Sequence, residues 1–404
     1  MKFFFIFIIA VLPLGGEIGL REALKLLKEK NYDAKMFEYE VKKSEGEYIQ
    51  SALFQNPVLS VNYTGLTFGG KHIVYDHSNT LFSVRIDQPI ELGNKRGYRK
   101  LSALYQLRTT EYLKGSFIRF LSLGLIYAYF QALADRAYLE YLQKDLEDFG
   151  KILAIQEQKQ KSGLISVIDF LKLQLYELEL KKALTQASAT YKRDLEEFNF
   201  YLGGGEYQPA DIEKIPEEVK LDELIEKSIQ RRESIKAIQE QIKSLDYEVK
   251  LIRAYRFPDI SVGLEYDSFG VNYKPGIGFG LSLLLPVFNV RQGDLITALA
   301  TKEQLLVSLK REEASIKKEI SVAFEDYEAS KQIFQSYLER KVVMDDLLER
   351  TKKAYLLGGI STLDFLDTLR THRSFMNAFL QARYLYIQNY YRLKILAGED
   401  DYEN

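Results

Sequence analysis

Polar and apolar residues alternate in four short windows, at about 58–68, 80–88, 259–268 and 276–285. Alternation with a period of two predicts β-strands that have one apolar and one polar face. Strands of about ten residues fit the transmembrane strands of an outer-membrane barrel, although a half-buried soluble sheet gives the same alternation. The charged residues on the polar side are Arg85, Asp87, Glu265 and Asp267.

Two proline-free tracts, 90–208 and 287–404, carry a helical pattern. Because proline costs about 3 kcal/mol inside a helix, each tract can hold continuous helix. We expect long helices at about 93–158 and 290–356, each followed by a glycine-containing turn and a returning helix, at about 166–202 and 362–397. Apolar residues recur at heptad spacing in the second long helix, which is typical of a coiled coil: Leu309, Ile316, Ala323 and, interleaved, Ile320, Tyr327 and Phe334.

The chain is a tandem duplication. Residues 21–61 match 222–262, and "SGLISVIDFL" at 162–171 matches "LGGISTLDFL" at 357–366. "QPIELGNKRG" (88–97) likewise sits over "LPVFNVRQG" (285–293). A repeated sequence predicts a repeated order of elements.

The duplication divides the chain into a first repeat at 17–206, a linker at 207–220 and a second repeat at 221–404. Each repeat is expected to open with one amphipathic helix, at about 18–54 and 221–256, followed by two of the strand windows. The predicted fold class is mainly α with a small β part.

The N-terminus reads "MKFFFIFIIAVLPLGGE". One lysine precedes an apolar run that is shorter than the roughly 20 residues a spanning helix needs. This pattern indicates a secretory signal peptide at 1–16, and a short buried helix is the alternative. Since no other stretch looks like a spanning helix, the mature protein is expected to leave the cytoplasm without a helical membrane anchor.

Composition narrows the function classes. The chain has no cysteine and only 3 histidines, which excludes disulfides, thiolate metal sites and cysteine catalysis. A net charge of −2 gives no global basic surface for nucleic acid. The run Gly203–Gly205 lacks the lysine of a phosphate-binding loop. We find no catalytic constellation and expect neither an enzyme nor a cofactor.

We assign no metal site from the sequence to the three histidines or to the carboxylates. His72 and His77 fall five apart in a predicted connection at 69–79, where they could bind a metal or simply be solvated. His372 stands alone on a helix and is expected at the surface or on a tunnel wall. The many carboxylates are expected to form solvated helix faces.

Four strands cannot close a barrel, and open sheet edges are not tolerated in lipid. The sequence therefore predicts oligomerisation. Three chains would give a twelve-stranded barrel, with the helices continuing as a tube. The charged positions Arg85, Asp87, Glu265 and Asp267 would then face a water-filled lumen.

This plan resembles the TolC-like outer-membrane factors of Gram-negative bacteria over essentially the whole mature chain. Three stretches look like the heavy-metal (cobalt-zinc-cadmium, CzcC-type) branch: "NPVLSVNY" at 56–63, "DQPIELGNKRGYR" at 87–99 and "LLPVFNVRQGDL" at 284–295. Many relatives carry a lipidated N-terminal cysteine, which this chain lacks.

The resemblance implies a homotrimeric channel-tunnel, with an outer-membrane β-barrel on a periplasmic α-barrel. It also implies docking onto an inner-membrane resistance-nodulation-division pump through a periplasmic adaptor protein. A passive conduit for heavy-metal cations is the first hypothesis. The alternatives are the same conduit for drugs, organic solutes or a type I secreted protein, and a structural coiled-coil surface protein without a channel.

The turns between the long helices are candidate sites. Gly163 and the pair Gly358–Gly359 permit the chain reversal. Ser166 with Asp169, and Ser361 with Asp364, are spaced as N-terminal capping boxes. Capping of the returning helix therefore accounts for one aspartate in each repeat without any further role.

Asp367 is the residue that capping leaves unexplained. It lies three residues after Asp364 and shares its helix face, whereas the first repeat has Lys172 at this place. In a trimer the two aspartates would surround the tunnel mouth, and rings of carboxylates select cations. The resemblance carries Tyr355, Asp364 and Asp367 onto the family's periplasmic gate, while Ile360 replaces the basic residue that some members have there.

Overall fold

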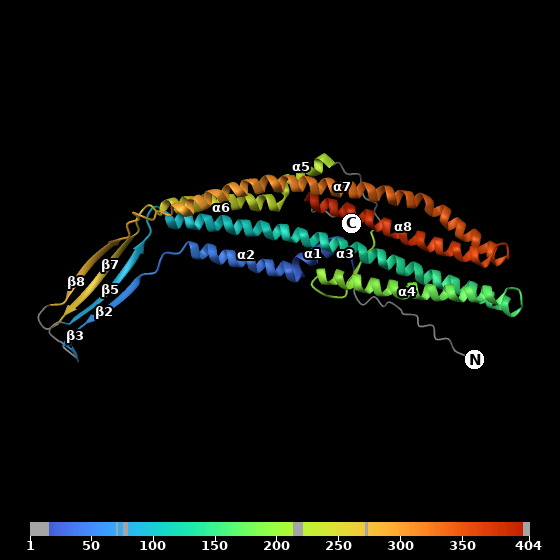
Figure 1. Cartoon of the computed structure of the whole chain (residues 1–404), viewed down its shortest axis with the longest axis horizontal. Coiled ribbons are helices and arrows are strands. Elements are labelled where there is room, and N and C mark those ends of the chain that lie inside the picture. The colour runs from blue at the N-terminus through green and yellow to red at the C-terminus, as the bar shows by residue number, and fades with distance from the viewer. Residues whose placement is uncertain (1–15, 70–71, 76–79, 213–220, 271–273, 399–404) are drawn as a thin grey trace. The chain divides into compact units, whose positions relative to one another are not determined.

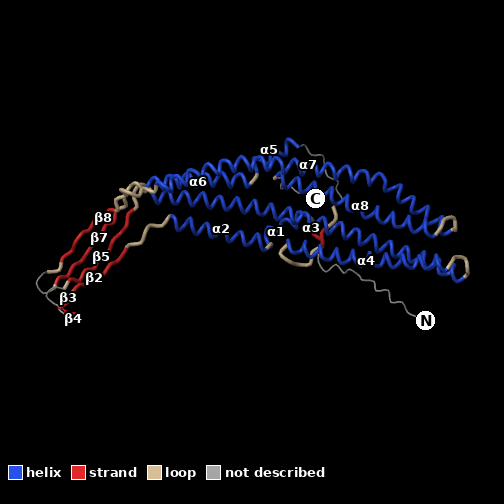
Figure 2. Tube along the Cα trace, viewed as in Figure 1, coloured by secondary structure: helices blue, strands red, loops and turns tan. Residues whose placement is uncertain are grey.

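A computed structural model describes residues 16–69, 72–75, 80–212, 221–270 and 274–398. Helices dominate, and most of the strands gather in one region (Figure 2). The helices are α1 (Leu20–Lys30), α2 (Tyr32–Ser51), α3 (Lys95–Lys161), α4 (Val167–Tyr201), α5 (Leu221–Arg231), α6 (Glu233–Ala254), α7 (Gln292–Leu356) and α8 (Thr362–Ala397). The predicted signal peptide lies outside the described residues except for Gly16.

The chain forms two compact units. Among the described residues, the hairpin unit comprises 16–37, 115–212, 221–232 and 313–398, and the sheet unit comprises those that fall within 38–114 and 233–312. The long helices α3 and α7 each contribute residues to both units.

The hairpin unit contains two antiparallel helix pairs. The chain reverses between α3 and α4 and again between α7 and α8 (Figure 1). Gly163 and Gly358 supply these reversals with φ angles of 75° and 79°, a backbone region that glycine adopts without strain. Both pairs begin and end within a few residues of the predicted helices, so this part of the prediction is confirmed.

Each predicted amphipathic helix is in fact two helices, so the prediction of single helices at 18–54 and 221–256 is wrong. α1 and α2 are separated at Asn31, whose side-chain oxygen accepts hydrogen bonds from the backbone N–H groups of Asp33 and Ala34 at 2.9 and 3.0 Å. That is the bonding of a helix N-cap. α5 and α6 are separated at buried Arg232, which pairs with Glu319.

Four strands form one antiparallel sheet in the sheet unit, in the order β2-β5-β7-β8. They are β2 (Val58–Thr64), β5 (Leu81–Ile90), β7 (Ile260–Phe269) and β8 (Gly276–Leu283). Only β5 and β7 have a strand on both sides, which leaves β2 and β8 as the edges.

Three further differences from the predicted strands appear. The window 58–68 is interrupted at Gly65, and β3 (Leu66–Gly69) pairs instead with β4 (His72–Tyr75). The expected loop at 69–79 is therefore strand over 72–75. β1 (Glu17–Ile18) and β6 (Gln208–Pro209) make a short parallel pair, so the start of the linker is part of the folded structure.

The register of the sheet separates its two faces. One row across the four strands is apolar: Leu59, Ile86, Leu264 and Phe279. The neighbouring row is Ser60, Arg85, Glu265 and Gly278. The exposed large apolar residues of these strands fall on one face, apart from Val58 and Phe269. No described residue of the chain forms a core on that apolar side.

The two repeats have the same backbone where strand gives way to long helix. Asn94 and Arg291 both have a φ of 58° and directly precede α3 and α7. Pro89 and Pro286 each lie five residues before them. The segments therefore correspond without the one-residue gap that the sequence alignment introduced, and Phe288 occupies the place of Glu91.

One helix in the described part of the chain, α3, has a window long and apolar enough to cross a membrane by length and composition. The prediction that no stretch after the signal peptide looks like a spanning helix is therefore wrong by length and composition. However, 56% of the window is buried inside the structure. Its apolar residues pack in the hairpin unit, as the core helix of a soluble bundle does.

Candidate functional site

The helix starts at the two turns are capped as the sequence predicts. Ser361 Oγ accepts the backbone N–H of Asp364 at 3.1 Å and donates to the carboxylate of Asp364 at 2.6 Å. Ser166 and Asp169 make the same pair of bonds at 3.0 and 2.7 Å. A carboxylate in the first turn also complements the helix dipole, so these contacts stabilise both returning helices.

The two turns of one chain touch each other. Lys159, at the end of α3, donates to the backbone carbonyl of Leu356 at 2.7 Å. The hydrogen bond from Ser166 lowers the pKa of Asp169, with further contributions from Lys172 and Thr362. Thr362 belongs to α8, so Asp169 bridges the two helix pairs and stays ionised to lower pH than an ordinary aspartate.

Tyr355, a predicted gate residue, is only 6% exposed. Its ring stacks on Phe365 at 4.1 Å with an angle of 7° between the planes, and its hydroxyl lies 3.3 Å from Thr362 Oγ1. Burial raises the pKa of Tyr355. The structure thus places Tyr355 in the apolar cluster that joins the two helix pairs, together with Phe149, Leu173, Tyr176, Phe365 and Leu369.

Asp364 and Asp367 both lie on the exposed side of α8, away from this cluster. One turn further on, Arg370 forms two hydrogen bonds with Glu179 of α4, at 3.0 and 3.2 Å. Glu179 foremost, and Asp367 to a smaller extent, raise the pKa of Arg370. Ile360 packs against the apolar cluster, so the turn itself carries no basic group beside the two aspartates.

His372 is not at the surface, and that prediction is wrong. It is 6% exposed and its two ring nitrogens lie 3.0 Å from the Tyr141 hydroxyl and 3.2 Å from Asp345. Burial alone would raise the pKa of Asp345, but hydrogen bonds from Lys341 and His372 outweigh it and hold that pKa below its usual value. This contact ties α3, α7 and α8 together at one level.

The expectation that all carboxylates are solvated is also wrong. Asp135 of α3 is buried and its carboxyl group contacts that of Asp194 of α4, which Arg193 pairs at 2.8 Å. Burial, and then the contact with Asp194, raise the pKa of Asp135 to about 7. Two carboxylates this close share one proton near neutrality, and that proton resides on Asp135.

We expect Asp135→Asn to change how stability depends on pH. A buried acid with a raised pKa contributes most stability below its unfolded pKa near 4, and loses it as pH rises towards about 7. Between pH 5 and pH 8 the parent should lose on the order of 2 kcal/mol of stability that the variant keeps. Melting temperature followed by circular dichroism across pH 5–8 measures this. The exposed Asp346→Asn is the matched control, and equal slopes for parent and variant would contradict the shared proton.

The polar face of the sheet is a connected network. Arg85 binds Asp87 at 2.8 Å on its own strand and Glu265 at 3.3 Å on β7. A Cβ atom on Gly280 would approach the Arg85 guanidinium to 2.5 Å, and one on Gly263 would meet Asp87 at 2.4 Å. The glycines therefore provide the space in which this network lies. Asp267 shares the face and pairs across the strands with Ser83.

The described residues contain no preformed metal site. Nowhere among them do three or more histidine, cysteine, aspartate or glutamate side chains come together in a way that could hold one ion. His72 is the first residue of β4. His77 lies outside the described residues. The predicted pairing of these two histidines therefore stays untested.

The chain matches known proteins along most of its length. A family model described as outer membrane efflux protein matches residues 224–399. The cobalt-zinc-cadmium resistance protein CzcC of Cupriavidus metallidurans is 21% identical over 382 residues, which is 92% of this chain and 86% of that protein.

Solved channel structures share the fold. The CusC structure aligns with a TM-score of 0.77 at 17% identity and covers 94% of this chain and 91% of CusC. The outer membrane channel CmeC of Campylobacter jejuni aligns with a TM-score of 0.78 at 15% identity, over 95% and 87% of the two chains. These matches confirm the resemblance that the sequence motifs indicated.

Proposed function

We propose that this chain, a relative of the outer membrane efflux proteins, is one subunit of a passive outer-membrane channel. The observation that carries the proposal is the four-stranded sheet, which has an exposed apolar face, a charged opposite face and two unpaired edges. A sheet of this kind is stable in a bilayer only when its edges are paired and its charged face meets water. The described residues hold no catalytic arrangement that would argue for an enzyme.

Three copies would complete the barrel. Four strands from each give twelve, and the edges β2 and β8 of neighbouring copies would pair. A twelve-stranded barrel is wide enough for an aqueous pore. The two long helix pairs of each copy would extend the pore into the periplasm, where we expect a periplasmic adaptor and an inner-membrane pump of the resistance-nodulation-division class to bind.

Heavy-metal cations are the cargo that the sequence favours. CzcC, a cobalt-zinc-cadmium resistance protein by name, matches 92% of this chain. On the charged face of the sheet each copy presents three carboxylates, Asp87, Glu265 and Asp267, against the single guanidinium of Arg85. A lumen with this net negative charge favours cations over anions.

The first test is the mass of the protein extracted in mild detergent, together with its conductance in planar bilayers. A trimer that forms pores supports the proposal, whereas a monomer or dimer without conductance would favour a coiled-coil surface protein. A deletion strain tests the cargo. Sensitivity to zinc, cobalt or cadmium supports metal export, and sensitivity to organic toxicants alone would move the cargo to drugs or other organic solutes.

We expect Arg85→Gln to increase the cation preference of the pore. The change removes one positive charge per copy and leaves Asp87 and Glu265 without the partner that neutralises them. Reversal potentials measured in asymmetric KCl should move towards the cation limit by several millivolts. Arg291→Gln, outside the sheet, is the control. An unchanged reversal potential would mean that this face of the sheet does not line the pore.

A further inference from the structure

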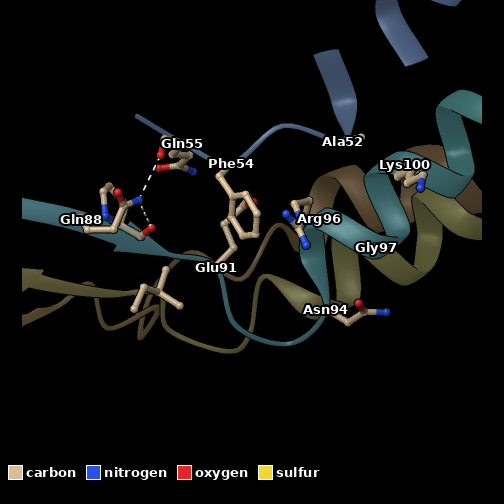
Figure 3. Close-up of a pocket in the computed structure, with 11 residues that line it drawn as sticks. Ala52, Phe54, Gln55, Gln88, Glu91, Asn94, Arg96, Gly97 and Lys100 are labelled. Carbon is tan, nitrogen blue, oxygen red and sulfur yellow. Dashed lines mark hydrogen bonds between the residues drawn. The ribbon is translucent and has the colours of Figure 1, made fainter. Parts of the chain in front are cut away.

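A cavity of about 890 Å³ opens beside the start of β2. It is lined from the segment after α2, from the end of β5 and from the first turn of α3, with Phe54, Gln55, Pro89, Ile90, Arg96 and Lys100 among its walls. Phe54 is 73% exposed, and the guanidinium of Arg96 lies over its ring at 3.5 Å. Figure 3 shows Phe54 and Arg96 side by side, with Glu91 close to Phe54 at the end of the strand.

Two charged side chains of the cavity lining already have contacts within the chain, because Arg96 lies over the ring of Phe54 and Glu91 pairs with Arg99. The two hydrogen bonds between Glu91 and Arg99 measure 2.6 and 2.9 Å. The ring of Phe54 and the aliphatic side chain of Ile90 offer apolar contact to a bound group. The guanidinium of Arg96 adds a cation over the face of the Phe54 ring. The chemistry fits an apolar or aromatic side chain better than a charged one.

The same unit exposes an apolar segment at its other edge. Residues 284–290, between β8 and α7, present Leu284, Leu285 and Val287 to solvent, and Phe288 is 94% exposed. Exposed clusters of large apolar residues mark interaction surfaces. No described residue of the same chain covers this segment.

Sheet topology brings the two features together between copies. β2 and β8 are the free edges, and neighbouring strands in the sheet are antiparallel. When β8 of one copy pairs antiparallel with β2 of the next, the end of β8 lies opposite the beginning of β2. The residues that follow β8 must then meet the residues that precede β2. The residues that precede β2 line the cavity.

The chain contains an internal example of this contact. β5 pairs with β7, and the residues after β5 bind the residues before β7. Leu92 N donates to Asp259 at 3.0 Å, and Lys95 Nζ donates to Phe257 O and Asp259, both at 2.7 Å. By the duplication, the segment after β8 corresponds to the segment after β5, and the segment before β2 corresponds to the segment before β7.

From this geometry we infer that the cavity is a socket for a second copy of the chain, and that Phe288 is the side chain it receives. The inference rests on the proposed trimer and names the residues that would join its subunits. The difference between the repeats agrees with it. Where the chain contacts itself, the first repeat has Glu91, which Arg99 neutralises. Where it would contact another copy, the second repeat has an exposed phenylalanine instead.

Cysteine cross-linking tests the socket directly, because the chain has no cysteine of its own. In the double variant Phe54→Cys, Phe288→Cys, a short bismaleimide should join neighbouring copies and give dimer and trimer bands on denaturing gels. Each single variant should give none. Phe54→Cys with Leu357→Cys, an equally exposed residue of the α7–α8 turn, is the negative control.

A second cysteine pair separates this inference from the proposed channel. Thr64→Cys with Gly276→Cys probes the pairing of β2 with β8 at the opposite ends of these strands. Cross-linking of this pair without cross-linking of 54 to 288 would overturn the socket and leave the trimer intact. Failure of both pairs, with a monomeric mass in detergent, would overturn the socket and the channel together.

A fluorescence measurement tests whether Phe288 faces lipid. The chain has no tryptophan, so Phe288→Trp introduces a single probe. In the socket its emission should be blue-shifted and little affected by brominated phospholipids. Strong quenching by those lipids would overturn the inference, since Phe288 would then lie in the bilayer.

Discussion

Replacing both Asp364 and Asp367 with alanine should raise the single-channel conductance several-fold and weaken the preference for cations. The two carboxylates lie exposed on one side of α8, and the turn before them brings no basic side chain. In a trimer six such groups would converge on the periplasmic entrance, where a ring of carboxylates both narrows the opening and holds cations. Planar bilayer recordings with the purified trimer measure both quantities.

The double variant also weakens a helix start, so the comparison needs a control for capping. Ser361→Ala removes the N-cap and costs about 1 kcal/mol, but it keeps both carboxylates. If the charge of the two aspartates controls the entrance, the conductance of Ser361→Ala should stay near that of the parent. Equal conductance and selectivity in parent and double variant would show that these aspartates do not form the gate.

Phe365→Ala should loosen the contact between the two helix pairs more than any other single change at the turns. Phe365 is fully buried, stacks on Tyr355 and belongs to the cluster that both pairs share. Removing a buried phenylalanine costs about 3–5 kcal/mol. We expect backbone amide exchange near the turns of α4 and α8 to speed up by two orders of magnitude or more, as hydrogen–deuterium exchange mass spectrometry would record.

Leu363→Ala, two positions away on the exposed side of the same helix, is the matched control. Its exchange rates should stay within a factor of about two of the parent, because surface substitutions change stability by less than about 0.5 kcal/mol. If both variants exchange equally, the ring stack does not hold the turns together.

The sequence predicted the regular parts of the structure well, for physical reasons that can be named. Period-two alternation located the strands that include Arg85 and Glu265, because one sheet face is apolar at nearly every position. Ser166 and Ser361 marked two helix starts, because a serine three residues before an aspartate satisfies the free N–H groups at that point.

The interruptions of helices were harder to foresee. Asn31 and Arg232 sit inside continuous amphipathic patterns, and their effect depends on contacts far along the chain. Asn31 donates to Tyr201 O at 2.9 Å, and Arg232 donates to Leu396 O at 3.3 Å. No local pattern contains such partners.

The burial of polar side chains was missed for a related reason. His372, Asp135 and Tyr355 lie on helix faces that look suitable for solvent when one helix is considered alone. In a coiled-coil assembly the buried face is decided by the neighbouring hairpin, here through contacts such as His372 with Tyr141 of α3. Such positions can be found from sequence only when the packing of the helices is already known.

The two free edges of the sheet have a consequence for assembly. β2 and β8 are different sequences on opposite sides, so a contact between them is heterologous and leaves one unused edge of each kind on every open oligomer. An isologous dimer that pairs β2 with β2 leaves both β8 edges unpaired, and head-to-tail addition ends only at ring closure. Open intermediates with one or two subunits therefore retain unpaired edge strands that can pair with other chains. Ring closure, rather than the first contact between subunits, is then the step that protects the protein from aggregation.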